Sequence, residues 1–143
     1  MGITQSSEWC RMNDQNPLTQ THAAHWDAKY RKAIRSSWTE NPYVQRHVNY
    51  RMTGDHRTHW LNWLFTDFLP ERPKRVLSIG CGDGSHELIV ARNSYADYVY
   101  GFDASSVGIG LANEAVTEES LSAEFEVRLF DDFANDPPAE PFD

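Results

Sequence analysis

The apolar residues of this chain change their spacing near residue 75. Before that point they recur every three or four positions, which is the period of a helix that buries one face. After it, short apolar runs alternate with helical stretches, which is typical of strands and helices in alternation. The pattern therefore predicts a helical N-terminal part followed by an α/β part.

Three helices are expected in the N-terminal part, after a loose polar lead-in. The first covers residues 21–38. The second begins at Pro42 behind an Asn41 cap, because asparagine accepts from the free N–H groups of the first turn and proline needs no N–H there. Asp55 is the predicted cap of the third helix, which presents a wide apolar face up to Phe68.

The second part is predicted to hold three strands. They cover residues 75–79, 98–102 and 125–130, and the helices between them cover residues 85–92 and run from Ser105 or Ser106 to residue 115. A strand–helix–strand connection is right-handed and makes the two strands parallel. We therefore expect an α/β fold with a parallel sheet, preceded by N-terminal helices.

Composition indicates one globular domain. Of the 143 residues, 40% are hydrophobic and 13% aromatic, which is too apolar for a disordered chain. No apolar run approaches the roughly 20 residues of a membrane span, and the N-terminus lacks the basic and apolar stretches of a signal peptide. With only Cys10 and Cys81 as cysteines, the expected location is the reducing cytoplasm.

The net charge of −8 is divided unevenly along the chain. Residues 1–75 hold 11 Lys/Arg and 7 Asp/Glu, a net charge of +4, whereas residues 76–143 hold 2 and 14, a net charge of −12. Binding to nucleic acid requires clustered cations that contact phosphates. We therefore expect no nucleic-acid partner, and no membrane partner.

The strongest chemical signal is a glycine-rich turn after the first predicted strand, Arg75-Val-Leu-Ser-Ile-Gly-Cys-Gly-Asp-Gly-Ser85. Glycine permits torsions and close approaches that a Cβ would block. The N–H groups of such a turn and of the next helix favour a carboxylate or phosphate. A second apolar run ends in Asp103, 19 residues after Gly84 and near the ~20 expected of a ribose-binding acid.

Two classes of cofactor fit this arrangement. Dinucleotide-binding folds have a further Gly or Ala where this chain continues with Ser85 and His86, which argues against NAD. The turn instead resembles the first motif of class I S-adenosylmethionine-dependent methyltransferases, which commonly reads Val-Leu-Asp-x-Gly-Cys-Gly-x-Gly. The resemblance spans Arg75 to Asp143 and implies a Rossmann-like sheet with strands in the order 3-2-1.

The resemblance also implies which residues contact the cofactor. In that family the glycine loop wraps the methionine part, and the acid at Asp103 binds both ribose hydroxyls. The adenine would pass Ala104 and Ser105 and meet Asp131, or Asp132 as the alternative, with Phe130 or Phe133 beside the ring. The complete set is Ser78, Gly80, Cys81, Gly82, Asp83, Gly84, Asp103, Ala104, Ser105, Asp131 and Asp132.

One position departs from the family pattern. The usual acid inside the first strand, which commonly contacts the amino end of the cofactor, is replaced by Ser78. We expect weaker binding, or compensation by Asp83 or by a residue of the N-terminal part. Cys81 is expected to be a small buried residue rather than a nucleophile.

The family sheet has seven strands in the order 3-2-1-4-5-7-6, and three are predicted here. We therefore expect a fragment of a longer protein, with completion by another chain as the alternative, and a 143-residue chain that is inactive and prone to aggregation alone. On this reading residues 1–21 are a lead-in, residues 22–73 a helical segment, and residues 74–143 part of the cofactor-binding domain.

The predicted function is methyl transfer from S-adenosylmethionine to a small-molecule or metabolite acceptor, with no catalytic residue assigned. An NAD-type oxidoreductase domain and a non-catalytic binding module are the alternatives. Two histidines one helical turn apart, without a clear third ligand, predict no metal site. Candidates for an acceptor site in the N-terminal helices are His47, Tyr50, Arg51, His56 and His59.

Overall fold

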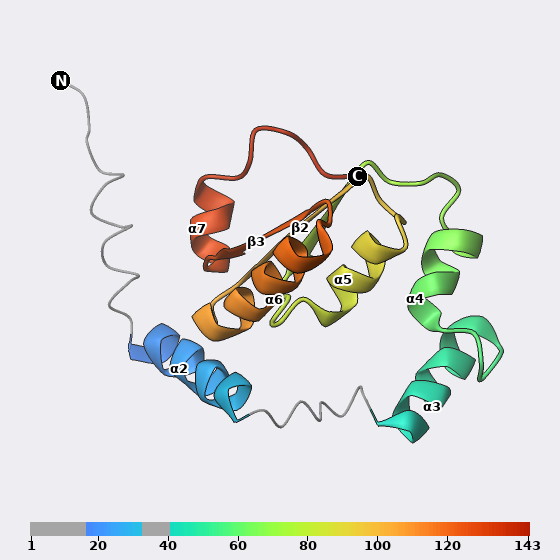
Figure 1. Ribbon diagram of the computed structural model, residues 1–143, viewed down its shortest axis with the longest axis horizontal. Helices are drawn as coiled ribbons and strands as arrows, with labels where there is room; N and C mark the ends of the chain where they lie inside the picture. The colour runs from blue at the N-terminus through green and yellow to red at the C-terminus, as the bar shows by residue number, and fades with distance from the viewer. Residues whose placement is uncertain (1–16, 33–40) are drawn as a thin grey trace.

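The computed structural model describes residues 17–32 and 41–143, which form helices around a small sheet (Figure 1). The elements are α2 (Pro17–Arg31), α3 (Pro42–Thr53), α4 (Trp60–Trp63) with a π-helical continuation over Leu64–Phe68, β1 (Arg75–Ile79), α5 (Ser85–Arg92), β2 (Tyr98–Asp103), α6 (Ser106–Glu119), β3 (Ala123–Val127) and α7 (Phe130–Asn135). No helix in these ranges is both long enough and apolar enough to cross a membrane.

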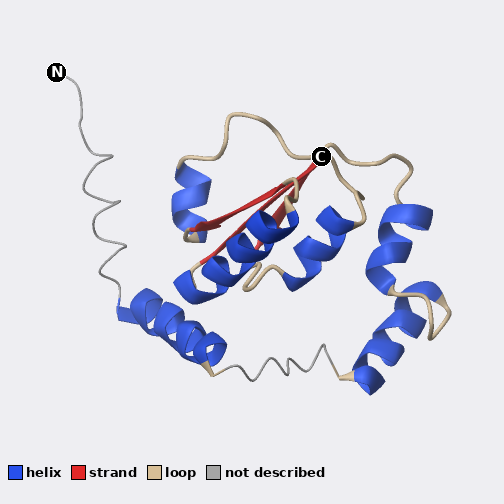
Figure 2. Cartoon of the chain, viewed as in Figure 1, coloured by secondary structure: helices blue, strands red, loops and turns tan. Residues whose placement is uncertain are grey.

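The three strands are parallel and lie in the order β1-β2-β3 (Figure 2). In register, Ser78 lies opposite Gly101, and Gly101 lies opposite Phe125. The predicted α/β fold, with a Rossmann-like parallel sheet preceded by helices, is confirmed. The carboxyl ends of β1 and β2 meet at one edge of the sheet, where ligands bind in open α/β folds.

Within the described sheet β1 is an edge strand that pairs with β2 alone. Ile79 at its end is 55% exposed. The start of β1 contacts Asp143, whose N–H donates to the carbonyl of Arg75 at 3.0 Å. The Asp143 carboxylate also accepts from the N–H groups of Lys74 and Arg75, at 2.6 and 2.9 Å.

The two faces of the sheet are covered by different helices, because side chains alternate along a strand. Figure 1 shows α5 and α6 in front of the sheet, and there Val99 and Phe125 belong to the core. On the other face the ring of Phe102 stacks on Phe133 at 4.7 Å, which brings α7 onto β2. The core thus fixes both flanks of the strand that ends in Asp103.

The N-terminal helices confirm one predicted start and correct another. Asn41 caps α3 by accepting from the Tyr43 N–H at 3.0 Å, and Gly54 ends this helix with a φ of +80°. The first helix begins at Pro17, inside the predicted lead-in. Its predicted continuation over residues 33–38 lies outside the described residues, as does Cys10.

The predicted cap of the third helix is wrong. The Asp55 carboxylate accepts from the N–H groups of Arg57 and Thr58, at 3.2 and 3.1 Å, and so closes a turn before the helix. His59 is the cap, since its Nδ1 accepts from the Leu61 N–H at 3.3 Å. An aspartate closes such a turn as readily as it caps a helix.

The third strand covers Ala123–Val127, earlier than the predicted residues 125–130. Its partner β2 ends at Asp103, and the N–H of Arg128 makes the last bond, to the Asp103 carbonyl at 3.0 Å. Beyond that point no neighbouring strand remains to pair with it. Phe130 therefore opens α7 instead of closing the strand.

Candidate functional site

The glycine turn after β1 is held against the end of β2. The N–H groups of Gly80 and Cys81 both donate to the carbonyl of Phe102, at 2.9 and 3.2 Å. The three glycines at positions 80, 82 and 84 have φ values of +72°, +61° and +69°. L side chains rarely adopt this region, so the turn depends on glycine for its backbone path.

The carboxylate of Asp103 bridges the turn and the start of α6. Its Oδ2 accepts from the Gly82 N–H at 3.0 Å, and its Oδ1 accepts from the Ser105 N–H at 2.8 Å. A carboxylate offers about four acceptor sites, so each oxygen keeps capacity for one more donor. Asp103 is therefore oriented by the backbone and can still accept from two further hydroxyl groups.

Several N–H groups of the turn are paired within the protein, namely those of Gly80, Cys81, Gly82, Gly84 and Ser85. Besides Gly82, the N–H of Gly84 donates to the Cys81 carbonyl at 3.0 Å. The Ser85 N–H donates to Asp83 Oδ1 at 3.3 Å. These donors are therefore already engaged, and the close approach that glycine permits is the contribution of this backbone to ligand binding.

Tyr30 of α2 lies directly against this turn. A Cβ built on Gly82 would come within 2.2 Å of the Tyr30 hydroxyl oxygen. Burial first, then the charges of Asp83 and Asp103, raise the pKa of Tyr30 to about 12, so the phenol is neutral at pH 7. In the sequence, Tyr30 is only one position within the helix predicted over residues 21–38.

Asp27 anchors α2 to the start of α6. Its carboxylate accepts from Ser105 Oγ at 2.6 Å, from the Val107 N–H at 3.1 Å and from Ser106 Oγ at 3.2 Å. The hydrogen bond from Ser105 is the main cause that lowers the pKa of Asp27. Figure 1 shows α2 beside α6, so the N-terminal helix covers the turn.

Ser105 has a structural role at this junction. It is fully buried, and its Oγ accepts from the Gly108 N–H at 3.1 Å as the N-cap of α6. With its N–H on Asp103 and its hydroxyl on Asp27, it joins β2, α6 and α2. Ala104, between the two polar residues, is partly exposed.

Ser78 lies in β1, just before the turn, and Cys81 lies within the turn. Ser78 Oγ donates to Glu87 Oε1 at 2.5 Å, a contact that the sequence did not indicate. Burial raises the pKa of the Cys81 thiol well above its usual value, and the charges of Glu87 and Asp103 add to the shift. Cys81 is therefore a protonated, partly buried thiol rather than a nucleophile.

The predicted adenine-side residues lie on α7. Asp131 is exposed in its first turn and Asp132 is half-buried. Phe133 packs on Phe102 in the sheet, whereas Phe130 is 57% exposed. Of the two phenylalanines, Phe130 is the one with a surface left for a ligand.

Three of the five N-terminal candidates, Tyr50, His56 and His59, make contacts at the helices α3 and α4. His56 donates through Nδ1 to the Arg46 carbonyl at 3.2 Å, and its ring stacks on Tyr50 at 4.5 Å. Burial lowers the pKa of His59, which suits its use of a neutral nitrogen as the α4 cap. His47 and Arg51 lie exposed on α3. Among the described residues, no group of three or more His, Cys, Asp or Glu side chains is placed to hold a metal ion.

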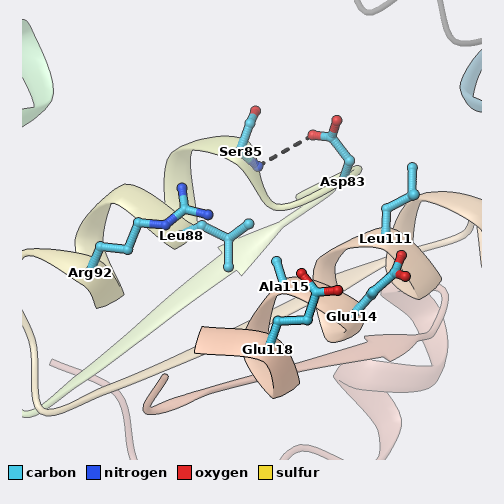
Figure 3. A pocket seen from close by; sticks show the side chains of 8 residues that line it. All are labelled: Asp83, Ser85, Leu88, Arg92, Leu111, Glu114, Ala115 and Glu118. Carbon is cyan, nitrogen blue, oxygen red and sulfur yellow. Dashed lines mark hydrogen bonds between the residues drawn. The ribbon is translucent and has the colours of Figure 1, made fainter. Parts of the chain in front are cut away.

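A groove of about 300 Å³ lies between α5 and α6 (Figure 3). Figure 3 shows Asp83, bonded to Ser85, at one end of it and Arg92 near the other. Arg92 forms an ion pair with Glu119 at 2.5 Å. Asp103 does not line this groove, which is therefore separate from the site built by the turn and β2.

Comparison with known proteins agrees with the geometry of the turn. A family model described as a methyltransferase domain matches residues 44–143, well over half of the chain. No curated protein matches the chain.

Several solved structures match part of the chain. A methyltransferase from Geobacter sulfurreducens, in complex with S-adenosyl-L-homocysteine, is 25% identical with a TM-score of 0.40, over 46% of this chain and 27% of that one. The YcgJ protein from Bacillus subtilis is 24% identical with a TM-score of 0.40, over 46% and 28%. TrmK from M. capricolum is 15% identical with a TM-score of 0.45, over 54% and 34%. The chain thus spans about a third or less of the length of these three structures.

Proposed function

Because the chain belongs to the methyltransferase domain family, we propose that it binds S-adenosylmethionine at the glycine turn and serves methyl transfer to a small-molecule acceptor. The Asp103 carboxylate is the observation that carries the proposal. It lies at the carboxyl end of β2, held by Gly82 on one side and Ser105 on the other. Two oxygens in a fixed plane suit the two neighbouring hydroxyls of a ribose, and their charge repels a phosphate.

The remaining contacts follow from the order of the elements. The methionine part lies along the turn, where glycine lets the backbone approach closely. The adenine lies beyond Asp103, past Ala104, and reaches the first turn of α7. There Asp131 or Asp132 accepts from the adenine amino group and Phe130 covers the ring.

The cofactor, when bound, supplies the methyl group of its sulfonium. Once the methyl group is transferred, the sulfur is left as a neutral thioether. The part of this chain is to bind and orient that group and to keep water away, since in-line displacement depends chiefly on alignment. Tyr30 contributes as a neutral side chain over the turn, since a phenol is protonated at neutral pH and burial raises the pKa of Tyr30 further, to about 12. No side chain of residues 17–32 and 41–143 is assigned as a catalytic base.

The acceptor is a small molecule in this proposal, in the cytoplasm. The net charge of −12 over residues 76–143 disfavours a polyanionic substrate such as RNA or DNA. Among the described cations, Arg31 of α2 pairs with Asp27, and Arg128 lies between Glu126 and Asp136.

The test is a pair of calorimetric titrations of the whole chain. S-adenosylhomocysteine is expected to bind saturably at one site, and NAD⁺ is expected to give no binding heat. Saturable binding of NAD⁺ without binding of S-adenosylhomocysteine would replace the proposal by the oxidoreductase alternative. If neither compound binds, the proposal that the chain binds a nucleotide-type cofactor is refuted.

A further inference from the structure

Glu87 is a half-buried carboxylate in the first turn of α5, beside the end of β1. Its Oε1 accepts a short hydrogen bond from Ser78 Oγ, at 2.5 Å. None of the ion pairs within residues 17–32 and 41–143 includes Glu87. A carboxylate that is partly removed from water gains most from a cationic partner. Among the described residues, Glu87 thus has a hydrogen-bond donor but no cationic partner.

This carboxylate lines a pocket of about 270 Å³ between α4, β1 and α5. Ser78, His86 and Glu87 are the polar residues of the lining, and the other lining residues are apolar. The ring of His86 is held by Trp60 of α4, at a centroid distance of 5.7 Å. Glu87 is therefore the only carboxylate that lines this pocket in the described structure.

Glu87 and Asp103 both lie near the glycine turn. The charges of both carboxylates reach the Cys81 thiol in the middle of the turn. In register Ser78 lies opposite Gly101, two residues before Asp103. A ligand that lies across the turn from β2 to β1, with a ribose on Asp103, would reach the end of β1, where Ser78 and Glu87 lie.

Asp83 does not line the pocket that holds Glu87. Its Oδ1 accepts from the Ser85 N–H at 3.3 Å, and the residue lines the separate groove between α5 and α6. The expectation that Asp83 compensates for the serine in β1 is thus less well supported than compensation by Glu87. Ser78 connects the two positions, since the hydroxyl that replaces the strand acid is bonded to the Glu87 carboxylate.

We infer that Glu87, oriented by Ser78, binds the α-ammonium group of S-adenosylmethionine. The inference rests on the proposed function. It gives a residue of α5 the role that an acid in the first strand would otherwise have. Glu87 is a binding residue in this account and Ser78 is a positioning residue. No covalent bond is made or broken at either residue. The contribution to cofactor binding is one ion pair in a pocket that is partly shielded from water.

The test combines a change in the protein with the matching change in the ligand. Such a thermodynamic cycle isolates the interaction between Glu87 and the ammonium group. The ligands are S-adenosylhomocysteine and its deamino analogue, in which hydrogen replaces the amino group. Glu87→Gln removes the charge and keeps the size of the side chain. By calorimetry with the whole chain, we expect Glu87→Gln to lower the affinity for S-adenosylhomocysteine about tenfold. The affinity for the deamino analogue should change by no more than about twofold.

Two further variants sharpen the result. Glu118→Gln makes the same charge change in the groove between α5 and α6, and both affinities should stay within about twofold. Ser78→Asp combined with Glu87→Gln returns a carboxylate to β1 and should recover most of the lost affinity. Thermal melting of each variant checks that the fold is retained.

An equal loss for both ligands would overturn the inference, because Glu87 would then act through the structure and not through the ammonium group. Unchanged binding of S-adenosylhomocysteine by Glu87→Gln would overturn it as well, and would leave the proposed function intact. Failure of the unaltered chain to bind either ligand would overturn the proposed function, and this inference with it.

Discussion

The backbone N–H of Gly82 donates to the carboxylate of Asp103 at 3.0 Å, and so ties the turn after β1 to the end of β2. The second oxygen of the same carboxylate holds the start of α6 through the Ser105 N–H, at 2.8 Å. The residue proposed to bind the ribose is therefore also part of the framework. Its orientation is set before a ligand arrives, which lowers the entropic cost of binding.

The close approach of α6 to the turn gives a first prediction. A Cβ on Gly108 would come 2.8 Å from the carbonyl oxygen of Gly82, which is backbone and has little room to move. We expect Gly108→Ala to lower the free energy of unfolding by about 1–3 kcal/mol, measured by urea denaturation. The same change should weaken the binding of S-adenosylhomocysteine.

Gly110 provides the matched control for this change. It lies in the same helix, and a Cβ there would meet nothing within 4 Å. Gly110→Ala should raise the stability by up to about 1 kcal/mol, because alanine has the higher helix propensity. Equal effects of the two alanines would refute the close approach at Gly108.

The anchor of α2 gives a prediction about pH. The hydrogen bond from Ser105 lowers the pKa of Asp27 below its ordinary value of 3.8. A carboxyl group with a depressed pKa in the fold stabilises it above the ordinary pKa, and this contribution is lost as the pH falls through the lower value. Hydrogen exchange of the α2 amides should therefore show constant protection from neutral pH down to about pH 5, and a loss of protection in acid below 3.8.

Asp27→Asn tests the assignment of this acid transition. The amide keeps an oxygen for one of the three donors but does not titrate in this range, so protection should be lower at neutral pH and the acid step in α2 should disappear. Asp55→Asn removes a carboxylate that closes its own turn, and it should leave the α2 transition in place. An acid step that persists in Asp27→Asn would assign the transition to another group.

The sequence predicted the parts of the site that depend on neighbours in the chain. The glycine turn and the acid 19 residues after Gly84 follow from the spacing within one strand–helix–strand unit. Contacts between segments that are far apart in the chain are not marked by any spacing in the sequence. The bond from Ser105 to Asp27 joins residues 78 positions apart, and nothing in the spacing of α2 marks Asp27 as a partner of α6.

The errors have the same origin. Asp55 has the residue type of a cap, but the packing of α4 decided where the helix begins, because Asn49 Oδ1 accepts from the Trp60 N–H at 3.1 Å. The missing acid at Ser78 was visible in the sequence, whereas its connection to Glu87 required α5 to be packed beside β1. Local chemistry was thus predictable, and its partners across the fold were not.

Ribose binding by Asp103 is tested by the affinity of Asp103→Asn for S-adenosylhomocysteine, measured by calorimetry beside Asp97→Asn. Asp97 precedes the opposite end of β2, where it pairs with Arg72 at 2.6 Å, so the control carries the same substitution away from the turn. Removal of a charged acceptor of two hydroxyls should weaken binding by about tenfold or more in Asp103→Asn. The Asp97→Asn control should bind as the unaltered chain does. Equal affinities of the two folded variants would contradict the account.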